Sequence, residues 1–126
     1  MAAGKYNFTI EQGTTVKLEF LYKDSNGNPI DLTNYGGRMQ IRPDVGSNTV
    51  YITLSSSLQP DGTGLNFSGS NGTTPPTSGS IGMYISAVSA SALNFDQAVY
   101  DLEIYSGNFV SRILEGQVKL SKEVTR

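Results

Sequence analysis

The side chains in this sequence that could do chemistry are carboxylates, lysines and tyrosines, because its 126 residues include no histidine and no cysteine. A Ser-His-Asp or Cys-His nucleophile, a redox cysteine pair and a zinc site built from either residue are therefore excluded. Four acidic residues are candidates for paired-carboxylate hydrolysis of glycosides: Glu11, Glu19, Asp101 and Glu103. They occupy outward or alternating strand positions beside basic residues such as Arg38, as a solvated face would arrange them. We expect no catalytic residue and no enzyme.

A calcium loop is the second candidate for chemistry. Asp24, Asn26 and Asn28 have the spacing of its first three oxygen ligands. That loop requires a glycine and a bidentate glutamate where this sequence has Pro29 and Tyr35. Turn chemistry explains the same residues, because Asn-Gly adopts the positive φ of a hairpin turn. We expect a turn here, with no metal and no cofactor.

The seven tyrosines are the third candidate. A tyrosine ring can stack on a sugar while its hydroxyl forms a hydrogen bond, so an exposed row would indicate a carbohydrate-binding module. However, Tyr6, Tyr22, Tyr84 and Tyr100 fall within alternating apolar patterns. Packing in the core or at a subunit interface is the favoured interpretation, and binding of a host-surface glycan stays an alternative.

The elements that would position these residues are short strands. Glycine (14 residues), serine, threonine and asparagine separate segments in which apolar residues alternate with polar ones. The expected strands cover residues 6–10, 16–22, 38–42, 50–54, 63–68, 81–85, 100–105, 109–114 and 118–120, with a break or bulge at 115–116. Eight or nine short strands with short connections predict an all-β, antiparallel β-sandwich.

Two details of the core follow from the same pattern. Phe20 is central in the clearest alternating strand, so we expect it to be a core residue. The only plausible helix is the small-residue run 86–93, one or two turns long. Val88, Ala92 and Leu93 of that run are expected to cap one end of the core.

Length and charge limit the remaining classes. A chain of this size fits one domain, residues 1–126, with a long exposed loop at 69–78. Its net charge of −2 and its scattered basic residues argue against nucleic-acid binding. The N-terminus lacks the apolar stretch of a signal peptide, and no segment has the length of a membrane span. We therefore expect synthesis in a cytoplasm and no membrane partner.

The order of motifs resembles small virion proteins of tailed bacteriophages, cyanophages in particular, and the N-terminal immunoglobulin-like domain of phage baseplate upper proteins. The resemblance rests on YNFTIEQGT (6–14), YKDSNGNPIDLT (22–33), RMQIR (38–42), YDLEI (100–104) and RILEGQVKL (112–120). It covers nearly the whole chain. Baseplate upper proteins continue beyond this domain, whereas the present sequence ends at Arg126.

The resemblance implies an immunoglobulin-like β-sandwich that serves as a non-enzymatic structural component of a virion. We expect it in the tail, at the baseplate or where fibres attach, as an adaptor. A capsid decoration or neck protein is the alternative. The implied partners are other virion proteins and copies of the chain itself in a symmetric assembly.

The expected partner surface combines the 69–78 loop with the segment 119–126, taken as an edge strand. An idle surface loop is the alternative, and the N-terminal arm 1–5 is the next candidate. The residues proposed for this interface are Gly69, Asn71, Thr73, Pro75, Lys119, Lys122 and Arg126.

Overall fold

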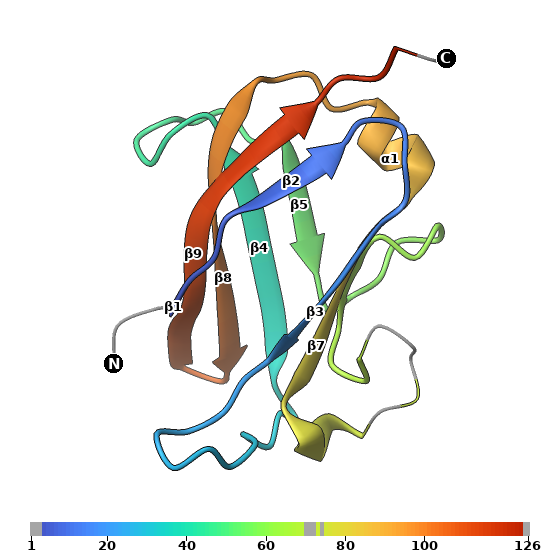
Figure 1. Cartoon of the computed structure of the whole chain (residues 1–126). Helices are drawn as coiled ribbons and strands as arrows, with labels where there is room; N and C mark the ends of the chain where they lie inside the picture. The colour runs from blue at the N-terminus through green and yellow to red at the C-terminus, as the bar shows by residue number, and fades with distance from the viewer. Residues whose placement is uncertain (1–3, 70–72, 74, 125–126) are drawn as a thin grey trace.

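The alternating segments form two β-sheets that pack face to face in the computed structural model, which describes residues 4–69, 73 and 75–124 (Figure 1). The strands are β1 (Gly4–Lys5), β2 (Phe8–Glu11), β3 (Val16–Leu21), β4 (Gly36–Arg42), β5 (Ile52–Ser55), β6 (Gly64–Asn66), β7 (Ser80–Ile85), β8 (Gln97–Ser106) and β9 (Phe109–Ser121). A 3₁₀ turn covers Pro76–Ser78, and helix α1 covers Ala87–Ser91. The predicted all-β sandwich with at most one short helix is confirmed.

The strand order is that of an immunoglobulin-like sandwich. A six-stranded sheet runs β1-β9-β8-β4-β5, with β2 also on β9, and a three-stranded sheet runs β3-β7-β6. The larger sheet contains β9, β8, β4 and β5 and the smaller contains β3, β7 and β6, which corresponds to the G, F, C and C′ strands and the B, E and D strands of variable-type immunoglobulin domains. The fold is therefore formed without the disulfide and tryptophan of antibody domains, because the chain has neither residue type.

Antiparallel pairing is expected from the short connections between successive strands, and the N-terminal strands depart from it. Strands β1 and β2 run parallel to β9, with Phe8 opposite Val118 and Ile10 opposite Leu120. Strands so distant in sequence are not joined by a hairpin, so no short turn imposes the antiparallel direction. The parallel register places Phe8 and Ile10 in the core.

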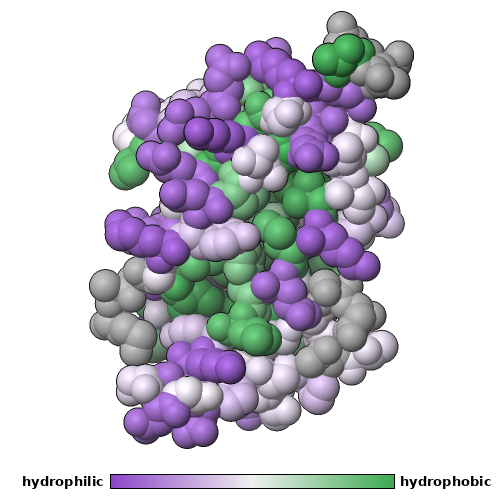
Figure 2. All heavy atoms as spheres, in the orientation of Figure 1, coloured by the Kyte–Doolittle hydropathy of each residue, from purple (hydrophilic) through white to green (hydrophobic). Residues whose placement is uncertain are grey.

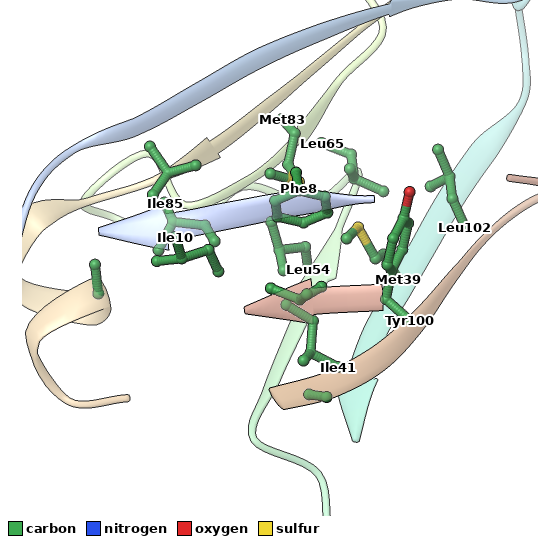
Figure 3. Close-up of a cluster of buried hydrophobic side chains, with 14 of the residues drawn as sticks. Phe8, Ile10, Met39, Ile41, Leu54, Leu65, Met83, Ile85, Tyr100 and Leu102 are labelled. Atoms are coloured by element: carbon green, nitrogen blue, oxygen red, sulfur yellow. The ribbon is translucent and has the colours of Figure 1, made fainter. Parts of the chain in front are cut away.

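The core lies between the two sheets and consists of the inward residues of the alternating strands. On β4, Met39 and Ile41 are buried while Arg38 faces solvent, as the sequence predicts. Figure 3 shows core side chains from both sheets meeting one another. The labelled ones are Phe8, Ile10, Met39, Ile41, Leu54, Leu65, Met83, Ile85, Tyr100 and Leu102.

Full burial of Phe20 does not hold. Its side chain points to the core face of β3 but is only partly buried, as is that of Leu18. The physical reason is position, because β3 is the outermost strand of its sheet and only β7 pairs with it among the described residues. An edge strand has packing neighbours on one side only.

The helix is where the sequence places it, but two of its three predicted core contacts are wrong. Ser86 caps α1 by accepting a hydrogen bond from the backbone N–H of Ser89. Leu93 is buried as predicted, whereas Val88 is 78% exposed and Ala92 is also exposed. The helical period instead turns Ala90 inward.

The predicted break at residues 115–116 is also absent. Strand β9 continues to Ser121, and the register against β8 shifts at Leu102/Glu103 instead, so that Ile113 is the extra residue of a β-bulge. Gly116 serves a different purpose. A Cβ at this position would collide with the backbone carbonyl of Tyr6, so only glycine allows the N-terminal segment to lie this close to β9.

Replacement of Ile81 with alanine should lower the free energy of unfolding by about 2–5 kcal/mol, because its fully buried side chain would leave a cavity between the sheets. Leu21→Ala is the matched control on the paired strand. Its side chain is 62% exposed, so the change should stay within about 0.5 kcal/mol. Urea unfolding measures both, and equal losses would contradict the placement of the core.

Candidate functional site

The charged residues that sequence analysis assigned to a solvated face gather on the outward side of the six-stranded sheet. Strand register arranges them in rows across neighbouring strands. One row consists of Ser55, Arg38, Glu103 and Arg112. The next consists of Thr53, Gln40, Asp101, Glu115 and Lys5. Acidic and basic side chains from four strands thus lie on one surface.

This surface is hollowed. A depression of about 680 Å³ lies over β4, β8 and β9, and Lys5 of β1 and Asp44 of the loop after β4 line its rim. The twist of a large sheet makes one face concave, which is the physical origin of such a hollow. We take this depression as the candidate site.

Two arginines form ion pairs with the acidic residues of β8. Arg38 Nε donates to Glu103 Oε1 at 2.7 Å, and its guanidinium also lies over the ring of Tyr105, 5.2 Å from the centroid. Arg112 Nε is 3.5 Å from Asp101 Oδ2. These ion pairs are partly exposed, so each contributes little to stability by itself. Their main effect is to fix the charge pattern of the surface.

Asp101 is a carboxyl of the site whose pKa is shifted. Burial raises the pKa of its carboxyl above the ordinary value, and the neighbouring carboxylate of Glu103 raises it further, while the charge of Arg112 opposes the rise. A carboxyl with a raised pKa in a hollow can act as a general acid. Here the same carboxyl faces an arginine, and the chain contains no histidine to serve as a base.

Arg42 contributes a positive charge whose guanidinium donates hydrogen bonds to uncharged groups. Its Nη2 and Nε donate to Gln40 Oε1 at 2.6 and 3.2 Å, and its Nη1 donates to the carbonyl of Ser47 at 2.7 Å. The guanidinium is thereby fixed without a carboxylate among these contacts. Chemically, the hollow offers fixed charges of both signs and hydrogen-bonding groups, which suit recognition of a polar surface.

A second polar cluster lies away from the hollow, at the start of α1. Asp61 Oδ2 accepts hydrogen bonds from Ser86 Oγ at 2.6 Å and from Ser89 Oγ at 3.0 Å, and Asp61 Oδ1 accepts from the backbone N–H of Thr63 at 3.0 Å. These bonds hold the pKa of Asp61 well below its ordinary value, the bond from Ser86 having the largest effect. The cluster ties the 56–63 loop to the helix cap, which is a structural role.

The turn at residues 24–29 forms as the sequence predicts. Asp24 Oδ1 accepts the backbone N–H groups of Asn26 and Asn28, each at 2.9 Å. Within the described ranges, no three acidic residues lie close enough together to hold a metal ion. The described part of the chain also contains no helix of the length and apolarity that crossing a membrane requires.

The predicted partner loop is ordered by its own chain at both ends. Gly69 is buried with a φ of 79°, and its N–H donates to the carbonyl of Asn66. At the other end, the N–H of Leu32 donates to the carbonyl of Pro76 at 3.0 Å. Thr73 and Pro75 are exposed, and Asn71 lies outside the described residues.

The C-terminal segment is not an edge strand, which corrects the premise on which it was chosen. Lys119 lies opposite Gln97 of β8 on one side and Thr9 of β2 on the other. Lys122 Nζ is 3.1 Å from Asp96 Oδ1. Arg126 lies outside the described residues. The parallel pairing of β2 covers the edge that a terminal strand would otherwise expose.

The two halves of the predicted interface lie at opposite ends of the sandwich (Figure 1). The 3₁₀ turn Pro76–Ser78 lies just before the first residue of β7. Glu123 lies near the other end of that strand, because its N–H donates to Gln12 Oε1 and Gln12 precedes Val16, the partner of the last residue of β7. They therefore do not form one surface. Neither half lines the hollow.

The sequence did not identify Arg42, Arg112 and Glu115 as site residues, although all three line the hollow. They come together only through the strand register, which the sequence does not reveal.

Comparison with known proteins finds no family model that matches this chain and no match among curated proteins. The resemblance to phage virion proteins therefore rests on the residues of the sequence alone.

Asp101→Asn should change the pH dependence of stability in a defined direction. A carboxyl whose pKa is raised in the folded state opposes folding once it ionises, so this unfavourable contribution is absent at low pH and present at neutral pH. Relative to the wild type, the variant should gain stability between pH 3 and pH 7 in urea unfolding. Arg112→Gln, which removes the opposing charge, should produce a change of the opposite sign, and a pH-independent difference would contradict this assignment.

Asp61→Asn should change the pH dependence of stability in the direction opposite to that of Asp101→Asn. Since the folded-state pKa is lowered, ionised Asp61 stabilises the fold above its ordinary pKa of 3.8, and this stabilisation is lost as pH falls through the folded-state value. The variant should unfold at a lower urea concentration than wild type at pH 7, with the difference shrinking in acid. Asp44→Asn is the control, because the hydrogen bond from the Gly46 N–H needs only one side-chain oxygen, whereas Asp61 uses both of its oxygens.

Proposed function

We propose that the chain is a non-enzymatic structural component of a bacteriophage virion that acts by protein–protein contact. The proposed place is the tail, at the baseplate or where fibres attach, with a capsid decoration or neck position as the alternative. The ordered motifs of the sequence suggest the virion, and the surface of the fold supports a role in contact. The observation that carries the proposal is the presence of exposed apolar side chains at one end of the sandwich.

We call this end the loop end. It brings together residues 22–35, the turn at 75–79 and the β8–β9 hairpin around Gly107. At the hairpin, Phe109 is 54% exposed and Val110 is 49% exposed. The ring of Tyr35 meets that of Phe109 edge to face at 6.1 Å. Phe109 and Val110 are consecutive in β9, so their side chains leave opposite faces of the sheet. Exposed aromatic and aliphatic side chains of this kind are typical of a surface that contacts another protein.

The charged hollow supports the same role. Its two β8 carboxylates each face an arginine, which suits a fixed pattern of charge for recognition more than proton transfer. The aromatic rings support contact rather than sugar stacking. Tyr100 is buried and donates its hydroxyl to the carbonyl of Tyr6 at 2.6 Å, while the half-buried Tyr51 stacks on the buried ring of Phe95. Such rings do not offer an exposed row.

The proposal predicts that the protein is found in purified particles of the phage that encodes it. Mass spectrometry of whole particles and of isolated tails should detect it in both, which would also locate it in the tail. Its presence in whole particles but not in tails would indicate the head or neck. Its absence from purified particles, while it is present in infected cells, would refute the virion role.

Replacement of both Phe109 and Val110 with serine should reduce incorporation into particles without unfolding the protein. Exposed residues contribute little to stability, so the change in the free energy of unfolding should stay within about 1 kcal/mol. Val88→Ser on α1 is the control, because Val88 is more exposed but lies at the opposite end. Normal incorporation of the double variant would show that the loop end is not the contact surface.

A further inference from the structure

The turn at residues 24–29 carries an asparagine followed by a glycine, Asn26 and Gly27, and both are exposed. Figure 2 shows hydrophilic side chains at the lower end of the molecule, where Figure 1 places this turn. The side-chain amide of Asn26 has no hydrogen-bond partner among the described residues. Beyond the neighbouring residues, nothing lies within 4 Å of a Cβ placed on Gly27. The carboxamide of Asn26 can therefore rotate toward the backbone nitrogen that follows it.

This arrangement permits a covalent change in which the backbone nitrogen of Gly27 is the nucleophile. After losing its proton, this nitrogen attacks Cγ of Asn26. The bond from nitrogen to Cγ forms, the bond from Cγ to Nδ2 breaks, and Nδ2 takes up the proton and leaves as ammonia. Water then opens the resulting five-membered succinimide at either carbonyl, which yields aspartate or isoaspartate at position 26. Glycine favours ring closure because it places no side chain beside the attacking nitrogen.

No other described asparagine is followed by glycine. Asn28 is also exposed and lies in the same turn, but it precedes Pro29, whose nitrogen has no proton to lose. The others are followed by Phe, Tyr or Thr, and they are Asn7, Asn34, Asn48, Asn66, Asn94 and Asn108. The second Asn-Gly pair of the sequence, at 71–72, lies outside the described residues.

Asp24 opposes this reaction by holding the turn closed. Its backbone carbonyl accepts the N–H of Gly27 at 3.0 Å, which is the proton that must be lost before attack. Its Oδ1 accepts the N–H groups of Asn26 and Asn28, each at 2.9 Å. The nitrogen of Gly27 can attack only while the turn is open. The rate in the folded protein is therefore the rate of the open turn multiplied by the fraction of time that the turn is open.

We propose that Asn26 is a site of spontaneous deamidation in this chain and that Asp24 sets its rate. The change places a new carboxylate two residues from Asp24, and the isoaspartate product also lengthens the backbone by a methylene group. Both products alter the loop end, to which residues 22–35 belong. The modification is measured on the purified protein, so its outcome is distinct from that of particle incorporation.

Peptide mapping of the purified full chain by mass spectrometry, after storage in mildly alkaline buffer, tests the site. The peptide that contains Asn26 should gain the mass that results when OH replaces the amide NH₂. It should separate into aspartate and isoaspartate forms, and fragmentation should place the change at residue 26. Asn28 lies two residues away and should remain an amide, which makes it an internal control. Gly27→Ala should slow the change, because the added methyl group crowds the attacking nitrogen.

The role of Asp24 is tested by two matched variants. Asp24→Ala removes the oxygen that accepts two of the N–H groups of the turn, so deamidation at Asn26 should be severalfold faster than in wild type. Asp24→Asn keeps a side-chain oxygen and should stay close to the wild-type rate. Circular dichroism should show the same fold for both variants, because the turn is exposed.

Three results would each overturn the proposal. The first is a wild type in which Asn26 remains an amide while a synthetic peptide of residues 22–30 converts under the same conditions. The second is conversion of Gly27→Ala as fast as that of wild type. The third is an Asp24→Ala variant that converts no faster than Asp24→Asn.

Discussion

The backbone of Tyr6 lies directly against β9 at Gly116, and most of the architecture depends on this contact. The N–H of Tyr6 donates to the carbonyl of Glu115, and the carbonyl of Tyr6 accepts the hydroxyl of Tyr100 from β8. The contact directs the N-terminal segment to the six-stranded sheet. There, Phe8 and Ile10 complete the core. Because β2 pairs with β9, it does not pair with β3, and β3 is the outermost strand of the three-stranded sheet.

The two sheets divide the surface into regions of different chemistry. The outward face of the six-stranded sheet carries ordered rows of charge, in which Arg38 and Arg112 flank Glu103. The loop end carries exposed aromatic and aliphatic groups. Strand β3 is the outermost strand of the smaller sheet, and its Leu18 and Phe20 side chains are partly buried. The charged groups and the exposed apolar groups thus lie on different parts of the molecule.

Alternation of side chains made much of the fold predictable. It placed Met39 and Ile41 inward and Arg38 outward, and it located most of the strands and the one helix, because local periodicity depends only on neighbouring residues. Pairing between distant segments was not predictable in this way. This long-range pairing determines three features: the parallel pairing of β2 with β9, the partial burial of Phe20, and the position of Lys119 between two neighbouring strands. The charged hollow was missed for the same reason, since no local signal places Arg112 beside Asp101.

The parallel direction of β2 and β9 has a mechanical consequence. Because the first and last long strands run the same way, the described chain enters the sandwich at one end and leaves it at the other (Figure 1). Tension applied through the two termini would act along the strands and load their hydrogen bonds in shear, all together. An antiparallel terminal pair would instead open one bond at a time. The parallel pairing of β2 and β9 would therefore resist such a pulling force more strongly than an antiparallel pairing of the same two strands.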